Sequence, residues 1–337
     1  LDPFNRQPVK NTLVISTTGM GDCLWGTPGI RSLKKSFPDM GIDLLIRPQW
    51  ESLYQSNPHI RKVIRYQPQW YRQLALLPRL LGTHYDYVLV FHANKDIGRV
   101  LPRLRYSKIW AHQNLPNLRD DQILKFKEIT HPILRRTAIL DKSGVESDGT
   151  QMEIFLSETD HTEVISFLNQ NQMIAKQFVY LNIGASLPHK RWPSDRMVSL
   201  AKLFLEKTAL GIVLGGGPED AQTIQQIESQ LGQGRVTHAF HRPLRANCAL
   251  IDQARLVITT DTGPMHIAFA TKTPTLAMFG PTRPEDSGPC QIDPQLCQVL
   301  QSTAMENLNH APVEESHFFD SITVEMVWEK ANQFLTR

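Results

Sequence analysis

The sequence contains little cysteine and no long apolar run. Its four cysteines, Cys23, Cys248, Cys290 and Cys297, form no CxxC pair, which argues against a zinc site or a redox dithiol and predicts buried, reduced thiols. No stretch approaches about eighteen consecutive apolar residues, so we expect no membrane span. No apolar segment of signal-peptide length precedes the first expected strand, and we therefore expect a cytoplasmic protein.

Length and composition indicate a globular chain of two domains. The 337 residues are too many for one ordinary core, and 41% hydrophobic with 20% charged residues are globular rather than disordered proportions. We expect an N-terminal domain at 1–160, a C-terminal domain at 161–320 and a closing helix at 321–337. The less apolar region 141–175 is expected to be the linker.

Short apolar runs alternate with amphipathic stretches along both halves. Strands are expected at 13–17, 42–46, 63–66, 87–91, 178–183, 211–215, 236–240, 256–260 and 275–279, and helices near 194–208, 219–231, 245–253 and 264–271. This alternation predicts two α/β domains, each a doubly wound parallel sheet covered by helices on both faces. Such sheets bind ligands beyond the carboxyl ends of their strands, so we expect a ligand in the crevice between the domains.

The charge of the chain is unevenly distributed. Residues 1–150 hold 22 Lys and Arg against 13 Asp and Glu, a net charge of +9, whereas the remainder carries −6. The asymmetry indicates an anionic partner for the N-terminal half, such as nucleic acid, an acidic lipid headgroup or an acidic sugar. Ordinary surface solvation explains it equally well.

The segment TTDTGPMHIAFA, at 259–270, carries the sharpest signal. A buried strand is expected to end there in a tight turn of Asp261, Thr262 and Gly263, and Pro264 starts a helix. Free amide groups at that helix start form an anion site, to which Thr262 adds a hydroxyl and His266 a nearby ring. A plain helix cap is the alternative.

A second strand is followed by the Gly/Ser loop of LNIGASLPHKRWPSDRM, at 181–197. Gly184 and Ser186 leave room for a ligand, and Lys190 is a natural point-charge partner for a diphosphate. The alternative is a solvated loop lysine. Trp192 is expected to pack rather than to stack on a base.

The segment TTGMGDCLWGTPGIRSL, at 17–33, resembles a dinucleotide fingerprint but does not fit it. Gly19 and Gly21 match, yet Leu24 occupies the third glycine position and Asp22 would repel a pyrophosphate. A carboxylate in this loop suits a general base, although from the segment alone a helix cap is the better interpretation. Thr27 is expected to cap the helix that follows.

The segment VLGGGPEDAQ, at 213–222, places three glycines after a strand. The glycines give the backbone room for a ligand, and Glu219 or Asp220 could bind a ribose hydroxyl. Helix capping explains the two acids equally well.

Taken together, these segments resemble glycosyltransferase family 9, the bacterial lipopolysaccharide heptosyltransferases, over most of the chain. GDCLWGTPGIRSLKKSFP (21–38) is similar to the N-terminal segment of the family. DTGPMHIAFA followed by FGPTRPEDSGP (279–289) is similar to its C-terminal signature and is the most specific part. GASLPHKRWP (184–193) and GGPED (216–220) fall where the family places its donor loops.

The resemblance implies a GT-B fold, two Rossmann-like domains facing across a cleft, with acceptor on the N-domain and ADP-heptose on the C-domain. It implies inverting transfer of a heptose without a metal or other cofactor, and the sequence has no D-x-D triplet. Carried over, the roles are a base at Asp22, an acceptor-side loop at Gly19 and Gly21, and a donor site at Gly184, Ser186, Lys190, Glu219, Leu244, Asp261, Thr262, Gly263, Pro264 and His266. Within that site Lys190 and the Thr262 and Gly263 amides hold the diphosphate, and the stretch 242–244 lines the adenine.

The resemblance also implies the partners. The acceptor is an acidic inner-core sugar, Kdo or heptose, on a glycolipid of the inner leaflet, so the enzyme is expected at the cytoplasmic face of the inner membrane, peripherally bound, with no nucleic acid partner. Arg31, Lys34 and Lys35 are the first candidates for membrane contact. A different nucleotide sugar, a nicotinamide-dependent oxidoreductase and a non-catalytic binding protein are the alternatives. Because Asn caps helices about as well as Asp, Asp22→Asn is expected to leave stability almost unchanged.

Overall fold

The computed structural model describes residues 9–126, 131–232, 234–303 and 318–336. The chain divides into two compact units, a first unit of Leu1–Phe155 and a second unit of Leu156–Arg337. The division precedes the expected boundary at residue 160, because helix α5 (Glu158–Gln170) already packs against α8 (Leu244–Asp252) of the second unit. The expectation that 141–175 is simply a linker is therefore wrong for the part that forms α5.

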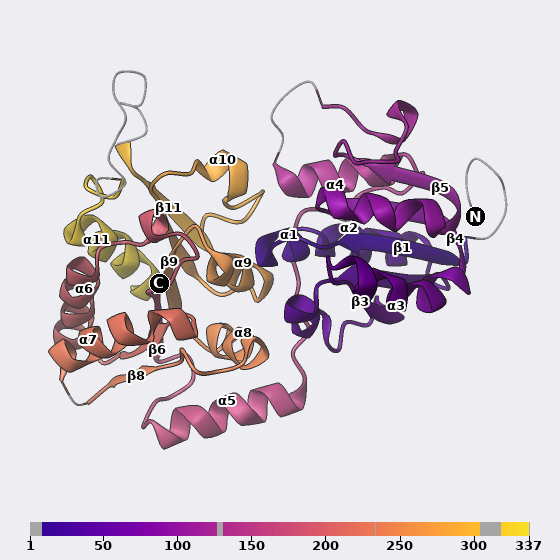
Figure 1. The fold of residues 1–337 in the computed structure, drawn as a ribbon. Coiled ribbons are helices and arrows are strands. Elements are labelled where there is room, and N and C mark those ends of the chain that lie inside the picture. The colour runs from indigo at the N-terminus through magenta and orange to yellow at the C-terminus, as the bar shows by residue number, and fades with distance from the viewer. Residues whose placement is uncertain (1–8, 127–130, 233, 304–317, 337) are drawn as a thin grey trace. The chain divides into compact units, whose positions relative to one another are not determined.

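The first unit is built on a parallel sheet with the strand order β3-β2-β1-β4-β5 (Figure 1). The strands are β1 (Asn11–Ser16), β2 (Gly41–Ile46), β3 (Lys62–Arg65), β4 (His84–His92) and β5 (Arg105–Ala111). Leu13, Val14 and Ile15 of the central strand have no exposed surface, as in a sheet covered on both faces. The expected parallel α/β class is confirmed, and β5 is an additional strand that the sequence patterns did not predict.

The helices of this unit are α1 (Met20–Leu24), α2 (Thr27–Ser36), α3 (Trp70–Leu81) and α4 (Pro132–Asp141). Helices α2 and α4 pack together on one face of the sheet, and α3 lies on the other (Figure 1). The expectation that Thr27 caps α2 is wrong. Gly26 precedes the helix, and Thr27 is its first residue, with a hydroxyl that donates to the Leu24 carbonyl at 2.8 Å.

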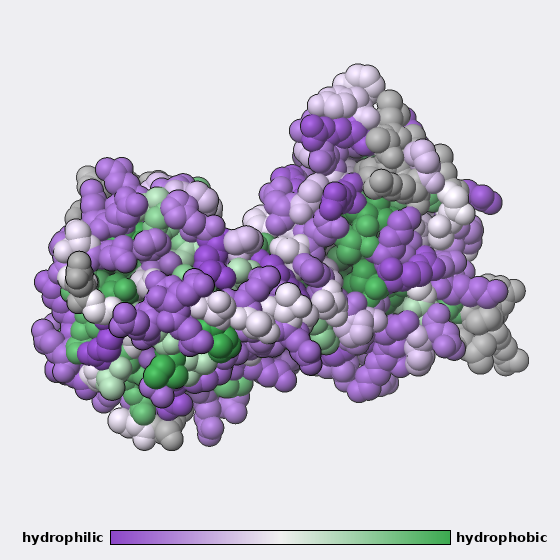
Figure 2. All heavy atoms as spheres, turned by 90° about the horizontal axis from the view of Figure 1, so that it is seen from below, coloured by the Kyte–Doolittle hydropathy of each residue, from purple (hydrophilic) through white to green (hydrophobic). Residues whose placement is uncertain are grey.

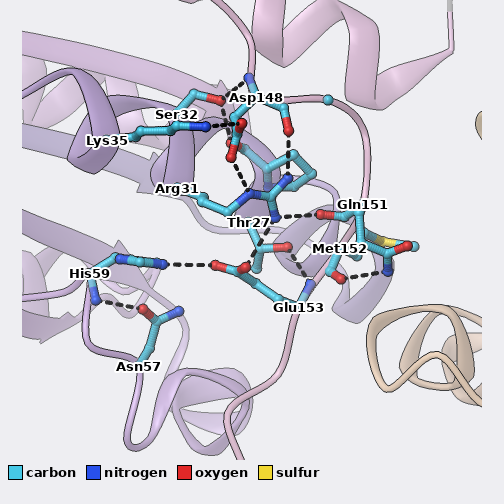
Figure 3. Close-up of polar contacts among 12 residues, drawn as sticks. Thr27, Arg31, Ser32, Lys35, Asn57, His59, Asp148, Gln151, Met152 and Glu153 are labelled. Atoms are coloured by element: carbon cyan, nitrogen blue, oxygen red, sulfur yellow. Dashed lines mark hydrogen bonds and ion pairs between the residues drawn. The ribbon is translucent and has the colours of Figure 1, made fainter.

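The end of the first unit is tied to α2 by ion pairs (Figure 3). The Arg31 guanidinium lies 3.2 Å from Asp148 and 3.0 Å from Glu153, and it donates to the Gln151 carbonyl at 2.7 Å. Lys35 reaches Asp148 at 2.6 Å. Because these contacts hold segment 148–153 on the helix, Arg31 and Lys35 have carboxylate partners within the protein.

The second unit is built on a parallel sheet with the order β11-β10-β9-β6-β7-β8. The strands are β6 (Phe178–Asn182), β7 (Gly211–Gly215), β8 (Val236–His238), β9 (Leu256–Thr260), β10 (Thr275–Phe279) and β11 (Cys297–Gln301). All were expected except β11. The helices of this unit are α6 (Ser194–Lys207), α7 (Ala221–Leu231), α9 (Gly263–Ala270), α10 (Pro284–Ser287) and α11 (Val324–Leu335), together with α5 and α8.

The closing helix α11 belongs to the core of the second unit. It packs against α6 (Figure 1). The rings of Trp328 and Phe204 meet there edge to face, with their centroids 5.1 Å apart. Trp192 is 3% exposed and donates from its indole to the Ile322 carbonyl at 3.1 Å, so its expected packing role is confirmed.

The visible face in Figure 2 is covered largely by hydrophilic residues, with smaller apolar patches between them. Within the described residues, no helix combines the length and the apolar character needed to cross a membrane. The four cysteine side chains are buried, as expected.

Candidate active site

Asp22 lies directly after the first strand of the first unit. Strand β1 ends at Ser16, and Asp22 is the third residue of the short helix α1, whose N-cap is Gly19. Its Oδ2 accepts hydrogen bonds from the Gly19 N–H at 3.2 Å and from the Thr18 hydroxyl at 2.9 Å. The interpretation of Asp22 as a helix cap is therefore confirmed, and its role as a base stays a prediction. Gly21 lies within the same helix.

The other oxygen of Asp22 is held by a buried arginine. Arg136 of α4 has no exposed surface, and its guanidinium donates to Asp22 Oδ1 at 2.8 Å. The same guanidinium lies over the ring of Trp25, 5.3 Å from the centroid. Burial by itself raises the pKa of the Asp22 carboxyl, but the Arg136 charge, the nearby His92 and the two capping hydrogen bonds outweigh it, so the pKa lies below its ordinary value. The carboxylate is consequently ionised at neutral pH.

Two histidines lie at the same edge of this sheet. His92 ends β4, His112 follows β5, and their ring centroids are 5.9 Å apart. His92 Nδ1 is 2.7 Å from the Thr18 hydroxyl and 3.5 Å from Asp22 Oδ1. Burial lowers the pKa of His92 and lowers the pKa of His112 to about 4. Both rings are therefore neutral at neutral pH.

Lys190 and Asp261 form an ion pair in the second unit. Lys190 ends the short 3₁₀ helix Pro188–Lys190, and its Nζ lies 2.8 Å from Asp261 Oδ2 in the turn after β9. Asp261 is 7% exposed. Burial raises the pKa of its carboxyl, but the Lys190 charge, with contributions from His266 and Thr282, leaves the pKa below its ordinary value. The alternative of a solvated loop lysine is therefore wrong, because this cation has a buried counter-ion.

The start of α9 adjoins that pair. Thr262 is the N-cap, Gly263 and Pro264 are the first helical residues, and His266 is 4% exposed. The Thr262 hydroxyl accepts from the Asn182 side-chain amide at 3.1 Å, and the same amide donates to the Gly184 carbonyl at 2.8 Å. Asn182, the last residue of β6, therefore joins the two predicted donor loops.

Arg191 and Asp220 connect the loop after β6 to the loop after β7. Asp220 is 2% exposed, accepts from the Gly217 N–H at 2.9 Å, and lies 2.8 Å from the Arg191 guanidinium. A Cβ at Gly184 would lie 2.0 Å from Asp220 Oδ2, so the close approach of this carboxylate requires glycine there. Of the two acids considered for the ribose, Asp220 is thus committed to holding the loops.

The remaining predicted donor residues differ in accessibility. Ser186 and Glu219 are exposed, and Leu244 is partly buried as the first residue of α8. Arg242 and Pro243, from the stretch expected to line the adenine, border a cavity of about 460 Å³ together with Phe167. The Arg242 guanidinium lies 4.2 Å from the Phe167 ring centroid.

Tertiary contacts bring in residues that the sequence patterns did not single out. In the first unit, the residues around Asp22 are Thr18, His92 and Arg136. In the second unit, Asn182 and Arg191 connect the loops, and Asp261 pairs with Lys190. His92 and Asn182 could have been found, because each lies at the carboxyl end of a predicted strand, on the edge where such sheets bind ligands. Arg136 carried no such signal.

The described ranges contain no group of three or more His, Cys, Asp and Glu side chains that could hold a metal ion.

Comparison with known proteins places this geometry in context. The model of the family described as glycosyltransferase family 9 (heptosyltransferase) matches residues 103–316. Among curated proteins, the chain is 23% identical to lipooligosaccharide heptosyltransferase 2 of Haemophilus influenzae, over 97% of this chain and 100% of that protein.

Solved structures show the same fold. A glycosyltransferase family 9 protein from Veillonella parvula has a TM-score of 0.83 at 21% identity, covering 97% of both chains. The E. coli ADP-heptose LPS heptosyltransferase II has a TM-score of 0.77 at 20% identity, covering 97% of this chain and 98% of that one. The expected class of two Rossmann-like domains, the GT-B fold, is confirmed.

Proposed function

The chain belongs to glycosyltransferase family 9, the heptosyltransferases, and from this we propose that it transfers a heptose from ADP-heptose to an inner-core sugar of lipopolysaccharide. Its relatives and structural neighbours, which include the E. coli ADP-heptose LPS heptosyltransferase II, support this donor and this acceptor class. Membership in this family favours the proposal over the two alternatives, a nicotinamide-dependent oxidoreductase and a non-catalytic binding protein.

The Lys190–Asp261 pair at the start of α9 is the observation that carries the donor assignment. An ammonium 2.8 Å from a carboxylate, beside the Thr262 and Gly263 N–H groups at a helix start, offers a diphosphate a charge and hydrogen-bond donors. As the bond to the sugar breaks, the leaving ADP gains negative charge, which these groups stabilise more than they stabilise the bound donor. Glu219 and Leu244 are our candidates for the ribose and the adenine.

Asp22 is the proposed base. The acceptor oxygen attacks the anomeric carbon as its proton passes to Asp22, and the electron pair of the breaking C–O bond leaves with ADP, so the anomeric configuration inverts. The ionised state of Asp22 and its side-chain exposure of 19% make the carboxylate available for this step. No metal has a place in this mechanism.

The net charge of +9 in residues 1–150 supports an acidic glycolipid acceptor and peripheral contact with the anionic inner leaflet at the cytoplasmic face. The first candidates for that contact need revision. Arg31 and Lys35 are engaged with Asp148, and Lys34 donates to the Met40 carbonyl at 2.9 Å. The exposed Trp70 and Tyr71 at the start of α3, 65% and 54% accessible, are better placed to meet a membrane interface.

A direct transfer assay tests the proposal. The purified protein is incubated with ADP-heptose and with lipid A that carries inner-core Kdo, and the mass of the glycolipid is measured by mass spectrometry. We expect a mass increase of one heptose, with inverted anomeric configuration by NMR. Parallel reactions contain ADP-hexose and UDP-hexose. Turnover with one of these and none with ADP-heptose would favour the alternative of another nucleotide sugar.

A further inference from the structure

The Thr18 hydroxyl lies between Asp22 and His92. Its Oγ1 is 2.9 Å from Asp22 Oδ2 and 2.7 Å from His92 Nδ1. An ionised carboxylate can only accept hydrogen bonds, so Thr18 must donate its single proton to Asp22. His92 Nδ1 must then carry a hydrogen and donate it to Thr18, which fixes the direction of a chain from His92 through Thr18 to Asp22.

The hydrogen bonds to the Asp22 carboxylate leave one of its lone pairs without a donor in the described structure. Two oxygens offer about four lone-pair sites. Oδ2 accepts from the Thr18 hydroxyl and the Gly19 N–H, and Oδ1 accepts from Arg136 at 2.8 Å. Only Oδ1 has a second lone pair without a hydrogen-bond partner in the described structure, since His92 Nδ1 at 3.5 Å is directed to Thr18. An acceptor hydroxyl that approaches Asp22 meets this lone pair.

We propose that Thr18 and His92 are positioning residues, which hold Asp22 Oδ2 in place so that the remaining lone pair of Oδ1 faces the acceptor hydroxyl. This inference rests on the proposed role of Asp22 as the base. Arg136 fixes one oxygen from inside the protein, and the Thr18–His92 chain fixes the other from the partly exposed side, where the His92 side chain is 30% accessible. Without the second contact, the carboxylate can rotate about its bond to Cβ.

The charge state of His92 matters to the base. The groups that face this ring are Asp22 of α1, Arg135 and Arg136 of α4, and His112 after β5. A neutral His92 donates to Thr18 without adding charge. A protonated His92 places a cation 3.5 Å from Asp22 Oδ1, which makes the carboxylate a weaker base. Turnover is therefore expected to fall on the acid side, with a midpoint below the ordinary histidine value, because burial lowers the pKa of His92.

The test compares Thr18→Val with Thr18→Ser in the steady-state transfer assay. Valine keeps the shape and removes the hydroxyl, and serine keeps the hydroxyl. We expect kcat of Thr18→Val to fall by about tenfold to 100-fold, with the KM for ADP-heptose unchanged, because the base leaves its productive geometry. Thr18→Ser should recover most of this rate. A Thr18→Val enzyme with the wild-type kcat, or equal losses in both variants, would overturn the role of the hydroxyl.

His92→Gln tests the other end of the chain. Glutamine can still donate to Thr18 but cannot take a proton in this pH range, so the acid limb of the kcat profile should disappear while the plateau is kept within about threefold. A retained acid limb in this variant would refute the role of His92. Melting curves of all variants separate unfolding from loss of rate. Asp22→Asn, run alongside, distinguishes the two hypotheses: if it is fully active, the proposed base is wrong, and if it alone is inactive, only the positioning chain is wrong.

Discussion

Asp22→Asn is the substitution for which the structure changes the expected result most. Arg136 is fully buried, and among the described residues its carboxylate partner is Asp22, at 2.8 Å. Asparagine has a single acceptor oxygen, so it can accept either from this guanidinium or from the Gly19 N–H that Asp22 caps, and it removes the negative charge that compensates a buried cation. We therefore expect a loss of stability, because an arginine without a counter-ion is costly inside a protein.

The size of the effect follows from the geometry. Complete removal of one partner of a buried ion pair costs about 3–5 kcal/mol. Asparagine retains a hydrogen bond and the site is 19% exposed, so we expect about 2–3 kcal/mol for this variant. At roughly 2–4 °C per kcal/mol for a unit of this size, the melting temperature of the first unit should fall by about 4–12 °C.

The assay is a melting curve combined with urea unfolding at neutral pH. Asp39→Asn, on the same unit at an exposed carboxylate, is the matched control for the change in charge and should be neutral. Adding Arg136→Met to Asp22→Asn removes both partners and should restore part of the loss, which a double-mutant cycle measures. Because the pKa of Asp22 is lowered in the folded state, its contribution is present above the ordinary value of 3.8 and disappears as the pH falls through the folded pKa. An Asp22→Asn chain within about 0.5 kcal/mol of wild type at pH 7 would refute the reasoning.

Four further outcomes are expected. Lys190→Ala should weaken ADP binding by about 10- to 100-fold in calorimetry, because it removes a charge-assisted contact and leaves the Asp261 carboxylate facing the diphosphate. Adding Asp261→Asn should recover part of the affinity. Unchanged ADP binding in the single variant would remove Lys190 from the donor site. Burial lowers the pKa of His112 to about 4, so this ring binds a proton more readily in the unfolded protein than in the folded one. The free energy of unfolding should therefore fall by about 3 kcal/mol between pH 6.5 and 4. In His112→Gln, urea titrations should show a weaker dependence of this free energy on pH. The double variant Arg31→Ala, Lys35→Ala should have a lower melting temperature, because both ion pairs are lost, while its binding to anionic vesicles stays within about twofold of wild type. A large loss of vesicle binding would indicate that these residues contact the membrane. Transfer should survive EDTA, and complete loss that magnesium restores would contradict the mechanism.

The strands that the sequence did not predict share one property. β5 (Arg105–Ala111) and β11 (Cys297–Gln301) each lie at an edge of their sheet. Edge strands bury only part of their side chains, so RYSKIWA and CQVLQ mix charged or polar residues with apolar ones and lack the continuous apolar run of β1 or β9. Helix α5 was missed for a related reason, because its sequence ETDHTEVISFLNQ buries only a narrow stripe that includes Val164 and Leu168.

Charge partners were the other source of error. Lys190, Arg31 and Lys35 look like free cations in the sequence because their carboxylates are distant along the chain: Lys190 pairs with Asp261, and the other two pair with Asp148. Local propensity carries no information on such pairs, since they form only when separate elements pack together.

The sequence by itself determined the fold class and where the candidate site lies. Buried strands alternating with helices require parallel sheets, and parallel sheets place the loops after β1, β6, β7 and β9 at their carboxyl edges, which is where the glycine-rich and charged segments occur. Only the tertiary structure decided the state of the groups in that site. Asp22 is both a cap and the partner of an arginine 114 residues away, and its ionisation depends on that contact, because burial and charge act through space and not along the chain.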